Sequence, residues 1–235
     1  MRECRLGCAP LLPAESSGER DGGRRQPRGR LSPFAGTGKL SSVVDEQKEC
    51  LNTLRSMMLR DPDQFEFVPG IFELARFWTN ELRRPIVVVT NQSGIGRGYF
   101  DENAYADLTR WMCGRFEAEG TTITRVYHCP YHPLDGIGEY RRDHPWRKPE
   151  PGMLLQAASD LGLDSARCVI LGDKMSDIEA GAAAGIGLRI LVGSRHARAG
   201  AGTASHEAVA DLGEALKLLR SRFARPAPNQ RFGRP

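Results

Sequence analysis

Three short clusters of polar residues could together bind a phosphate ester and a divalent metal ion. They occupy residues 90–94 (TNQSG), 147–149 (RKP) and 172–177 (GDKMSD). Between them they supply a hydroxyl group, side-chain amides, cations and two carboxylates. Phosphoryl transfer depends mainly on positioning and charge neutralisation, and Mg²⁺ binds carboxylate and phosphate oxygens. The clusters therefore predict a metal-dependent phosphoryl-transfer site.

The segments around these clusters predict alternating strands and helices. Short β-branched or apolar runs, typical of buried strands, occupy residues 86–90, 123–128, 168–172 and 188–192. Helical patterns occupy residues 71–82, 101–119, 151–162, 176–185 and 212–223. Ser176 and Glu179 have the spacing of a capping box for the fourth of these helices.

This alternation is typical of an α/β fold with a mainly parallel sheet and helices on both faces. Ligands of such sheets bind outside the carboxyl ends of the strands. Residues 90–94 start at the last residue of one predicted strand, and residues 172–177 start at the last residue of another. Residues 147–149 directly precede a predicted helix. We therefore expect the three clusters to meet at one edge of the sheet.

Composition divides the chain into a body and two basic tails. Residues 1–39 carry a net charge of +4, residues 220–235 carry +5, and residues 40–219 carry −5. We predict a disordered basic tail over residues 1–39, one phosphatase domain over residues 40–223, best defined from residue 65, and a disordered tail over residues 224–235. The arginines that could contact nucleic acid lie in the first tail, where solvated disorder is the expected state.

The remaining bulk properties favour a cytoplasmic protein that binds no membrane. No apolar run approaches the length of a membrane span, and the start of the chain has no secretory apolar region. The six cysteines show no disulfide framework, so we expect reduced thiols. The expected partner is a small phosphorylated sugar rather than a nucleic acid, and the expected state is a monomer.

From residue 65 to about residue 192 the chain resembles the D-glycero-D-manno-heptose 1,7-bisphosphate 7-phosphatase family of the haloacid-dehalogenase (HAD) superfamily. The matching stretches are FEFVPGIFEL, VVVTNQSGIGRGYF, YHCPYHP, RKPEPGML and ILGDKMSDIEAGAAAGI. The resemblance implies a Rossmann-like three-layer sandwich with a small loop lid in place of a cap domain. It also implies Mg²⁺-dependent hydrolysis of the heptose bisphosphate at its 7-phosphate. The related histidinol-phosphate phosphatases remain an alternative.

The resemblance also implies roles for individual residues. Thr90 and Lys148 would be catalytic, because they contact the transferring phosphoryl group. Asp173 would bind Mg²⁺, whereas Asp177 would support the loop without binding the metal. The residues implied to bind the substrate are Asn91, Gln92, Ser93, Arg147 and Lys174.

The chain departs from the family at its beginning. Family members start with a strand that ends in D-x-D-G, whose first aspartate is the nucleophile, and no D-x-D-G precedes residue 65. Asp45 and the Asp61–Asp63 pair are weak substitutes, so the nucleophile is not identified. Residues 46–60 read as a helix, which leaves the first central strand of the sheet doubtful. A shifted reading frame or a wrong start would explain the mismatch, as would a catalytically dead relic that still binds phosphate.

A second departure concerns zinc. Many relatives hold a tetrahedral zinc ion with a C-x-H and a C-x-C motif. Here Cys129 remains, but Tyr131, His144 and Trp146 occupy the other ligand positions, and His132 is out of register. We therefore predict no structural zinc and a metal-free lid over residues 128–146.

Overall fold

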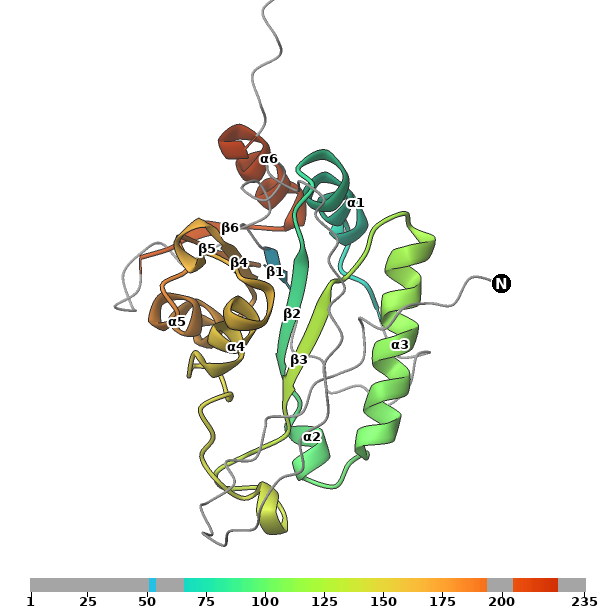
Figure 1. The fold of residues 1–235 in the computed structure, drawn as a ribbon, viewed down its shortest axis with the longest axis vertical. Coiled ribbons are helices and arrows are strands. Elements are labelled where there is room, and N and C mark those ends of the chain that lie inside the picture. The colour runs from blue at the N-terminus through green and yellow to red at the C-terminus, as the bar shows by residue number, and fades with distance from the viewer. Residues whose placement is uncertain (1–50, 54–65, 194–204, 224–235) are drawn as a thin grey trace, which may run out of the picture.

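The computed structural model describes residues 51–53, 66–193 and 205–223, and for residues 51–53 it describes the backbone alone. The predicted tails (1–39 and 224–235), Asp45 and the Asp61–Asp63 pair lie outside these residues. The described part of the chain forms one sheet with helices on both sides (Figure 1). The fold is therefore α/β with parallel strands, as the sequence predicts.

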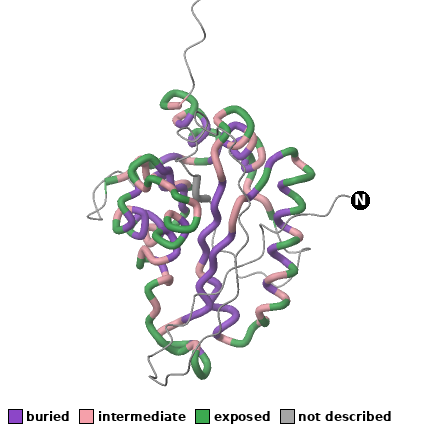
Figure 2. The backbone as a smooth tube through the Cα atoms, viewed as in Figure 1, coloured by how far each residue is buried: buried purple, intermediate pink, exposed green. Residues whose placement is uncertain are grey.

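The sheet has six strands in the order β3-β2-β1-β4-β5-β6, and every neighbouring pair is parallel. The strands are β1 (Leu51–Thr53), β2 (Ile86–Asn91), β3 (Arg125–Cys129), β4 (Val169–Gly172), β5 (Leu188–Val192) and β6 (Glu207–Val209). The strands predicted from apolar runs are thus confirmed with small shifts at their ends, while β6 was not predicted. Strands β2 and β4 are buried (Figure 2), which explains their continuous apolar sequences.

Strand β1 lies at the centre of the sheet, between β2 and β4. Leu51 pairs with Ile86 on one side and Val169 on the other. The prediction of a helix over residues 46–60 is therefore wrong at residues 51–53, and the first central strand is present. Without β1, the facing edges of β2 and β4 would bury unpaired backbone groups. That constraint outweighs local helix propensity here.

The helices form a layer on each face of the sheet. They are α1 (Ile71–Arg76), continued by a π-helical turn η2 (Phe77–Glu81), α2 (Ser93–Gly96), α3 (Glu102–Ala118), α4 (Gly152–Leu161), α5 (Met175–Ala183) and α6 (Leu212–Phe223). Short 3₁₀ turns, η3 and η4, cover Gly138–Tyr140 and Ser165–Arg167. Apolar residues of α1, α3 and α6 share one core with the sheet, and those of α4 and α5 share the core on the opposite face.

Local capping explains where several helices begin and end. The Asp101 carboxylate accepts a hydrogen bond from the Ala104 amide (2.8 Å), which starts α3 as the sequence predicts. Gly162 has a φ of 63° and ends α4 in the left-handed conformation that glycine tolerates. The predicted capping box of Ser176 and Glu179 is wrong, because α5 begins at Met175 and its first turn is capped by Asp177.

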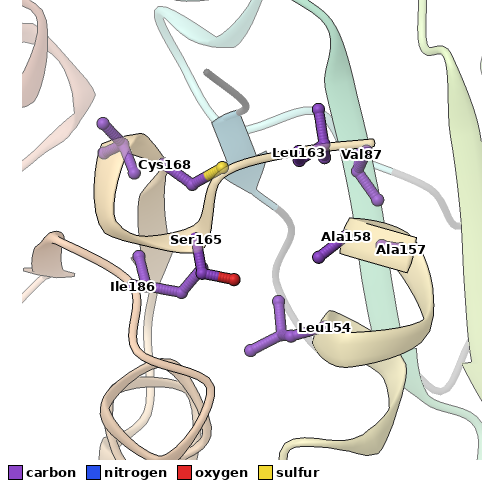
Figure 3. A pocket seen from close by; sticks show the side chains of 9 residues that line it. Val87, Leu154, Ala157, Ala158, Leu163, Ser165, Cys168 and Ile186 are labelled. Atoms are coloured by element: carbon purple, nitrogen blue, oxygen red, sulfur yellow. The ribbon is translucent and has the colours of Figure 1, made fainter. Parts of the chain in front are cut away.

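A small apolar cavity lies between α4 and the amino-terminal half of the sheet (Figure 3). Its lining includes Val87, Leu154, Ala157 and Ile186, and Ser165 is its one polar side chain. The cavity is at the opposite end of the strands from the predicted site, so we do not assign it to that site. Among the residues with a described structure, no helix is both long and apolar enough to span a bilayer.

Because β1 lies at the centre of the sheet, replacing Asn52 with proline should strongly lower the free energy of unfolding. Proline removes a backbone donor from the interior of a sheet, so Asn52→Pro should lower the free energy of unfolding by about 3 kcal/mol or more. Asn52→Val keeps the backbone N–H and should change it by less than about 1 kcal/mol. Urea denaturation measures both. Equal stability of the two variants would show that this strand is not part of the sheet.

Candidate active site

The first two sequence clusters are joined by a pair of hydrogen bonds at the carboxyl end of β2. The Asn91 amide nitrogen donates to the Lys148 carbonyl oxygen (3.0 Å), and the Lys148 backbone N–H donates to the Asn91 side-chain oxygen (3.0 Å). Both bonds hold the backbone of Lys148 against the end of the strand. Asn91 thus fixes the position of a residue 57 places later in the chain.

The ammonium group of Lys148 is buried and has two acceptors. Its Nζ lies 2.8 Å from the Val89 carbonyl oxygen and 2.7 Å from Asp177 Oδ1. The side chains of Lys148 and Asp177 are only 5% and 7% exposed. A charge so deeply buried is stable only when it is paired and hydrogen-bonded. Lys148 is therefore a fixed positive charge at the point where β2 and the loop after β4 meet.

Asp177 connects Lys148 to the third cluster. Its Oδ2 accepts a hydrogen bond from the Lys174 backbone N–H (3.2 Å), and its own N–H donates to the Lys174 carbonyl (3.0 Å). A Cβ atom at Gly172 would collide with the Cβ atom of Asp177, so this close approach requires glycine at the end of β4. The carboxylate thus holds Lys148 and the start of α5 at once.

The structure places Thr90, Gln92 and Ser93 in the buried part of the site. Gln92 Nε2 donates a hydrogen bond to Thr90 Oγ1 (3.2 Å). Because the Thr90 oxygen accepts this bond, its hydroxyl hydrogen can be donated to another group. Ser93 begins α2, directly after these residues. Gln92 thus contacts Thr90, and the substrate contact expected of Gln92 stays a prediction.

Asp173 and Lys174 follow the last residue of β4, and both are exposed. Asp177, by contrast, is paired with Lys148. Carboxylate oxygens suit Mg²⁺, so Asp173 is the carboxylate of this loop that fits the ion. Within the described ranges, no three His, Cys, Asp or Glu side chains cluster closely enough to hold a metal by themselves. A magnesium ion here would need further oxygens from water, the substrate or the rest of the chain.

The loop between β3 and α4 is held by aromatic packing. The rings of Tyr131 and His144 stack at 4.3 Å with an angle of 15°, and Arg142 lies over Tyr131 at 4.3 Å. Arg147 Nη1 donates to the Tyr131 carbonyl oxygen (3.0 Å). Two of the positions that bind zinc in relatives are thus occupied by stacked rings.

Cys129, the one position of the expected zinc motif that keeps the family's residue, is fully buried. Burial raises the pKa of its thiol to about 11, and the charges of Arg147 and Lys148 oppose this shift only in part. Zinc binds the thiolate, so a zinc ion at this position would have to displace the thiol proton. The absence of structural zinc stays a prediction, which metal analysis of the purified protein tests.

The sequence patterns did not predict two further charged residues near this loop. Arg97 Nη2 and Asp135 Oδ2 form an ion pair of 2.7 Å. Arg97 is part of the stretch VVVTNQSGIGRGYF that matches the family, and this match could have marked it as a candidate site residue. Asp135 carried no signal, because its contact depends on how the loop folds back over α2.

The buried ion pair predicts a large cost for removing Lys148. Lys148→Met keeps most of the side-chain volume but leaves the Asp177 carboxylate buried and unpaired, which should cost about 3–5 kcal/mol of stability. Adding Asp177→Asn should recover part of this loss. Lys217→Met, on the exposed side of α6, should change stability by less than about 0.5 kcal/mol. A Lys148→Met protein as stable as the Lys217 variant would contradict the pairing.

The lowered pKa values of two histidines predict that the loop between β3 and α4 is less stable in acid. Burial lowers the pKa of His132, with the charges of Arg147 and Arg97 adding to the shift, and burial followed by Arg142 lowers that of His144. Since each folded-state pKa lies below the ordinary value of 6.5, the unfolded chain binds more protons as the pH falls. Their contribution to stability is complete above about pH 6.5 and is lost below it.

Urea denaturation at several pH values between 7.5 and 5 measures this effect. The double variant His132→Asn, His144→Asn should show a shallower loss of stability in that interval. An unchanged slope would mean that these histidines do not titrate abnormally in the folded protein.

Comparison with known proteins agrees with this geometry. Residues 145–215 match the HAD-hydrolase-like family model. The chain is 47% identical over 135 residues to the D-glycero-α-D-manno-heptose-1,7-bisphosphate 7-phosphatase of Burkholderia mallei, covering 57% of this chain and 71% of the relative. It is 38% identical over 165 residues to the corresponding β-anomer phosphatase of Haemophilus influenzae, covering 67% of this chain and 87% of the relative.

A solved structure extends the similarity to the fold. The D,D-heptose 1,7-bisphosphate phosphatase from B. bronchiseptica, complexed with magnesium and phosphate, has a TM-score of 0.62 and 25% identity to this chain. The match covers 75% of this chain and 99% of that protein. The parallel sheet, the TNQSG, RKP and GDKMSD clusters and these relatives together show that the chain belongs to the D,D-heptose 1,7-bisphosphate phosphatase family of the HAD superfamily.

Proposed function

We propose that this protein is a Mg²⁺-dependent phosphatase that hydrolyses D-glycero-D-manno-heptose 1,7-bisphosphate at the 7-phosphate. The observation that carries the proposal is the buried Lys148 ammonium, held by Asn91, Asp177 and the Val89 carbonyl at the carboxyl ends of the strands. A fixed cation at that edge of a parallel sheet suits a phosphoryl group. The relatives named for this activity support the choice of substrate.

In this proposal Lys148 and Thr90 contact the transferring phosphoryl group. The ammonium has three N–H groups, and two of them face Val89 and Asp177, which leaves the third for a phosphoryl oxygen. Thr90 donates its hydroxyl hydrogen while its oxygen accepts from Gln92. Both donors are set before the substrate arrives, so little reorganisation is needed as charge develops.

Asp173 would hold Mg²⁺, and its exposed carboxylate at the end of β4 supports this role. When bound, the ion would neutralise charge on the phosphoryl oxygens. Asn91 positions Lys148, Asp177 pairs with it, and Ser93, Arg147 and Lys174 supply polar groups around the substrate. This division of roles keeps one carboxylate for the metal and the other for the lysine.

The nucleophile is not identified among the described residues. In the family an aspartate at the end of the first strand attacks phosphorus and breaks the P–O bond to the sugar, whose hydroxyl group leaves with a proton. Water then hydrolyses the aspartyl phosphate, which releases inorganic phosphate and restores the carboxylate. Strand β1 places its carboxyl end between β2 and β4, where such a group belongs. The candidate aspartates Asp45, Asp61 and Asp63 lie outside the described residues. Replacing each with Asn would identify the nucleophile by loss of turnover.

We further propose that residues 128–146 act as a metal-free lid that contributes to substrate choice, in a protein that works as a cytoplasmic monomer. The lid docks on α2, because the Ile137 N–H donates to the Gly96 carbonyl (2.7 Å). A Cβ atom at Gly96 would collide with the Pro130 carbonyl oxygen, so the two segments touch without intervening side chains. Such contact would keep the lid beside the substrate without zinc.

A phosphate-binding relic without activity is the second candidate. It is favoured by the sequence of residues 51–60 (LNTLRSMMLR), which includes β1 and contains no carboxylate where the family has its nucleophile. This candidate keeps the anion site of Lys148 and Thr90 but predicts no turnover.

Phosphate release from a panel of esters separates the two candidates. The panel contains both anomers of the heptose 1,7-bisphosphate, heptose 7-phosphate and histidinol phosphate, each with Mg²⁺ or with EDTA. We expect release of one phosphate, Mg²⁺ dependence, and the highest kcat/KM for a heptose bisphosphate.

Asp173→Asn should lower turnover by about 100-fold or more, since the metal loses its carboxylate. Glu117→Gln, which removes an exposed charge from α3, should leave turnover unchanged. A folded protein that binds inorganic phosphate but releases none from any ester would contradict the proposed function and support the relic.

A further inference from the structure

We infer that Glu102, acting through His128, is a positioning residue that holds Thr90 in the orientation needed to contact the phosphoryl group. The role depends on the proposed function, because it takes Thr90 as a donor to that group. Glu102 and His128 lie outside the three sequence clusters, and no step of the proposed mechanism uses either side chain.

Glu102 and His128 form a hydrogen bond between the first turn of α3 and the carboxyl end of β3. The two bonded atoms, His128 Nε2 and Glu102 Oε2, lie 3.0 Å apart. An ionised carboxylate only accepts hydrogen bonds, so the imidazole N–H is the donor. His128 is fully buried, and the ring of Tyr105 packs against its imidazole with the centroids 4.5 Å apart. The imidazole is thus held both by the carboxylate and by an aromatic ring.

The pair leaves two buried polar atoms unsatisfied. Neither Glu102 Oε1 nor His128 Nδ1 has a hydrogen-bond partner among the residues that the structure describes. Buried polar atoms are nearly always hydrogen-bonded, and an unpaired one destabilises the fold. Apolar side chains of similar size would fill the same space without this loss. Stability alone therefore does not explain why these two residue types occupy these positions.

His128 lies beside Thr90 in the sheet. Thr90 in β2 and His128 in β3 are paired in the parallel register, as are Val88 and Val126 two places earlier. The two valines belong to the core on the α3 side of the sheet. Side chains alternate between the two faces along a strand, so Thr90 and His128 project to that same side, on strands about 4.8 Å apart. The hydrogen bond from α3 thus supports the strand position next to the predicted catalytic hydroxyl.

Two further hydrogen bonds connect the end of β3 to the Thr90 hydroxyl group. Cys129 directly follows His128, and its carbonyl oxygen accepts the backbone N–H of Gln92 (2.8 Å). The Gln92 side chain in turn donates to Thr90 Oγ1 (3.2 Å). A shift of the end of β3 would therefore move Gln92 and rotate the hydroxyl group away from its present direction.

The residue that supports His128 is itself fixed near α2. The Asp101 side chain caps α3, so Glu102 is the first helical residue. The ring of Phe100, just before the cap, lies against α2, because a Cβ atom at Gly94 would collide with that ring. Glu102 thus reaches His128 from a helix start that is anchored separately from β3.

A purely structural role for the pair makes a different prediction. If Glu102 and His128 only stabilise the fold, Glu102→Leu should impair the site independently of Thr90. If they act through Thr90, the loss caused by Glu102→Leu should disappear once the Thr90 hydroxyl is removed. A double-mutant cycle of Glu102→Leu with Thr90→Val distinguishes the two cases.

The cycle is measured on the full chain with Mg²⁺, by turnover of heptose 1,7-bisphosphate and by calorimetry with inorganic phosphate. Thr90→Val should lower kcat by about 100-fold, since it removes a donor to the phosphoryl group. Glu102→Leu should lower kcat by about 10-fold and weaken phosphate binding, with a smaller change in KM. In the Thr90→Val background, Glu102→Leu should change kcat and phosphate affinity by less than about 2-fold.

Two matched variants separate positioning from general destabilisation. Glu102→Gln keeps an oxygen that accepts the His128 N–H, so its kcat should stay within about 3-fold of that of the unaltered protein. Tyr127→Phe removes a hydrogen bond to Asp160 (2.9 Å) from the residue just before His128, on the opposite face of the same strand. Tyr127→Phe should lower the midpoint of urea denaturation but leave kcat unchanged.

The possible outcomes separate this role from the proposed function. Losses that multiply in the double variant, or a Glu102→Gln protein as impaired as Glu102→Leu, would overturn the positioning role. If no ester is hydrolysed but phosphate binding shows the coupling, the positioning role stands and the proposed hydrolysis fails. If the bisphosphate is hydrolysed and the losses multiply, only the positioning role fails. A protein that neither binds phosphate nor releases it would overturn both.

Discussion

One buried ion pair organises the functional end of this fold. The ammonium of Lys148 lies among the carboxylate of Asp177, the carbonyl oxygen of Val89 and the backbone that Asn91 holds. None of these groups could be buried alone without a large desolvation cost. Because the pair joins β2, the loop before α4 and the first turn of α5, it fixes the relative positions of three segments that are distant in sequence. The proposed phosphoryl site is therefore a consequence of how this charge is buried.

The sheet supplies the second constraint. Parallel strands place their carboxyl ends at one edge, and β1 fills the gap between the strands that lead to Asn91 and Gly172. Without that central strand, nothing would fix the distance between β2 and β4. Around this rigid base the loop over α2 is held by rings, one ion pair and a close backbone contact at Gly96. The strand ends and the loop are thus supported by different kinds of interaction.

Much of this could be predicted from the sequence, where the physical signal is local. The apolar runs of β2, β4 and β5, the Asp101 cap and the left-handed Gly162 need only their neighbours in the chain. Strand β1 could not be predicted, since its residues become a strand only through pairing with β2 and β4. The start of α5 was misplaced for a similar reason, because Asp177 serves both the helix cap and Lys148. The contact between Gln92 and Thr90 and the pair of Arg97 with Asp135 also depend on tertiary packing.

A crystal structure of the protein with Mg²⁺ and inorganic phosphate would test the central claim most directly. We expect an anion within hydrogen-bonding distance of Lys148 Nζ and Thr90 Oγ1, together with a metal ion bound by Asp173. An anion bound elsewhere, or a Lys148 ammonium turned away from Asp177 and the strand ends, would contradict it.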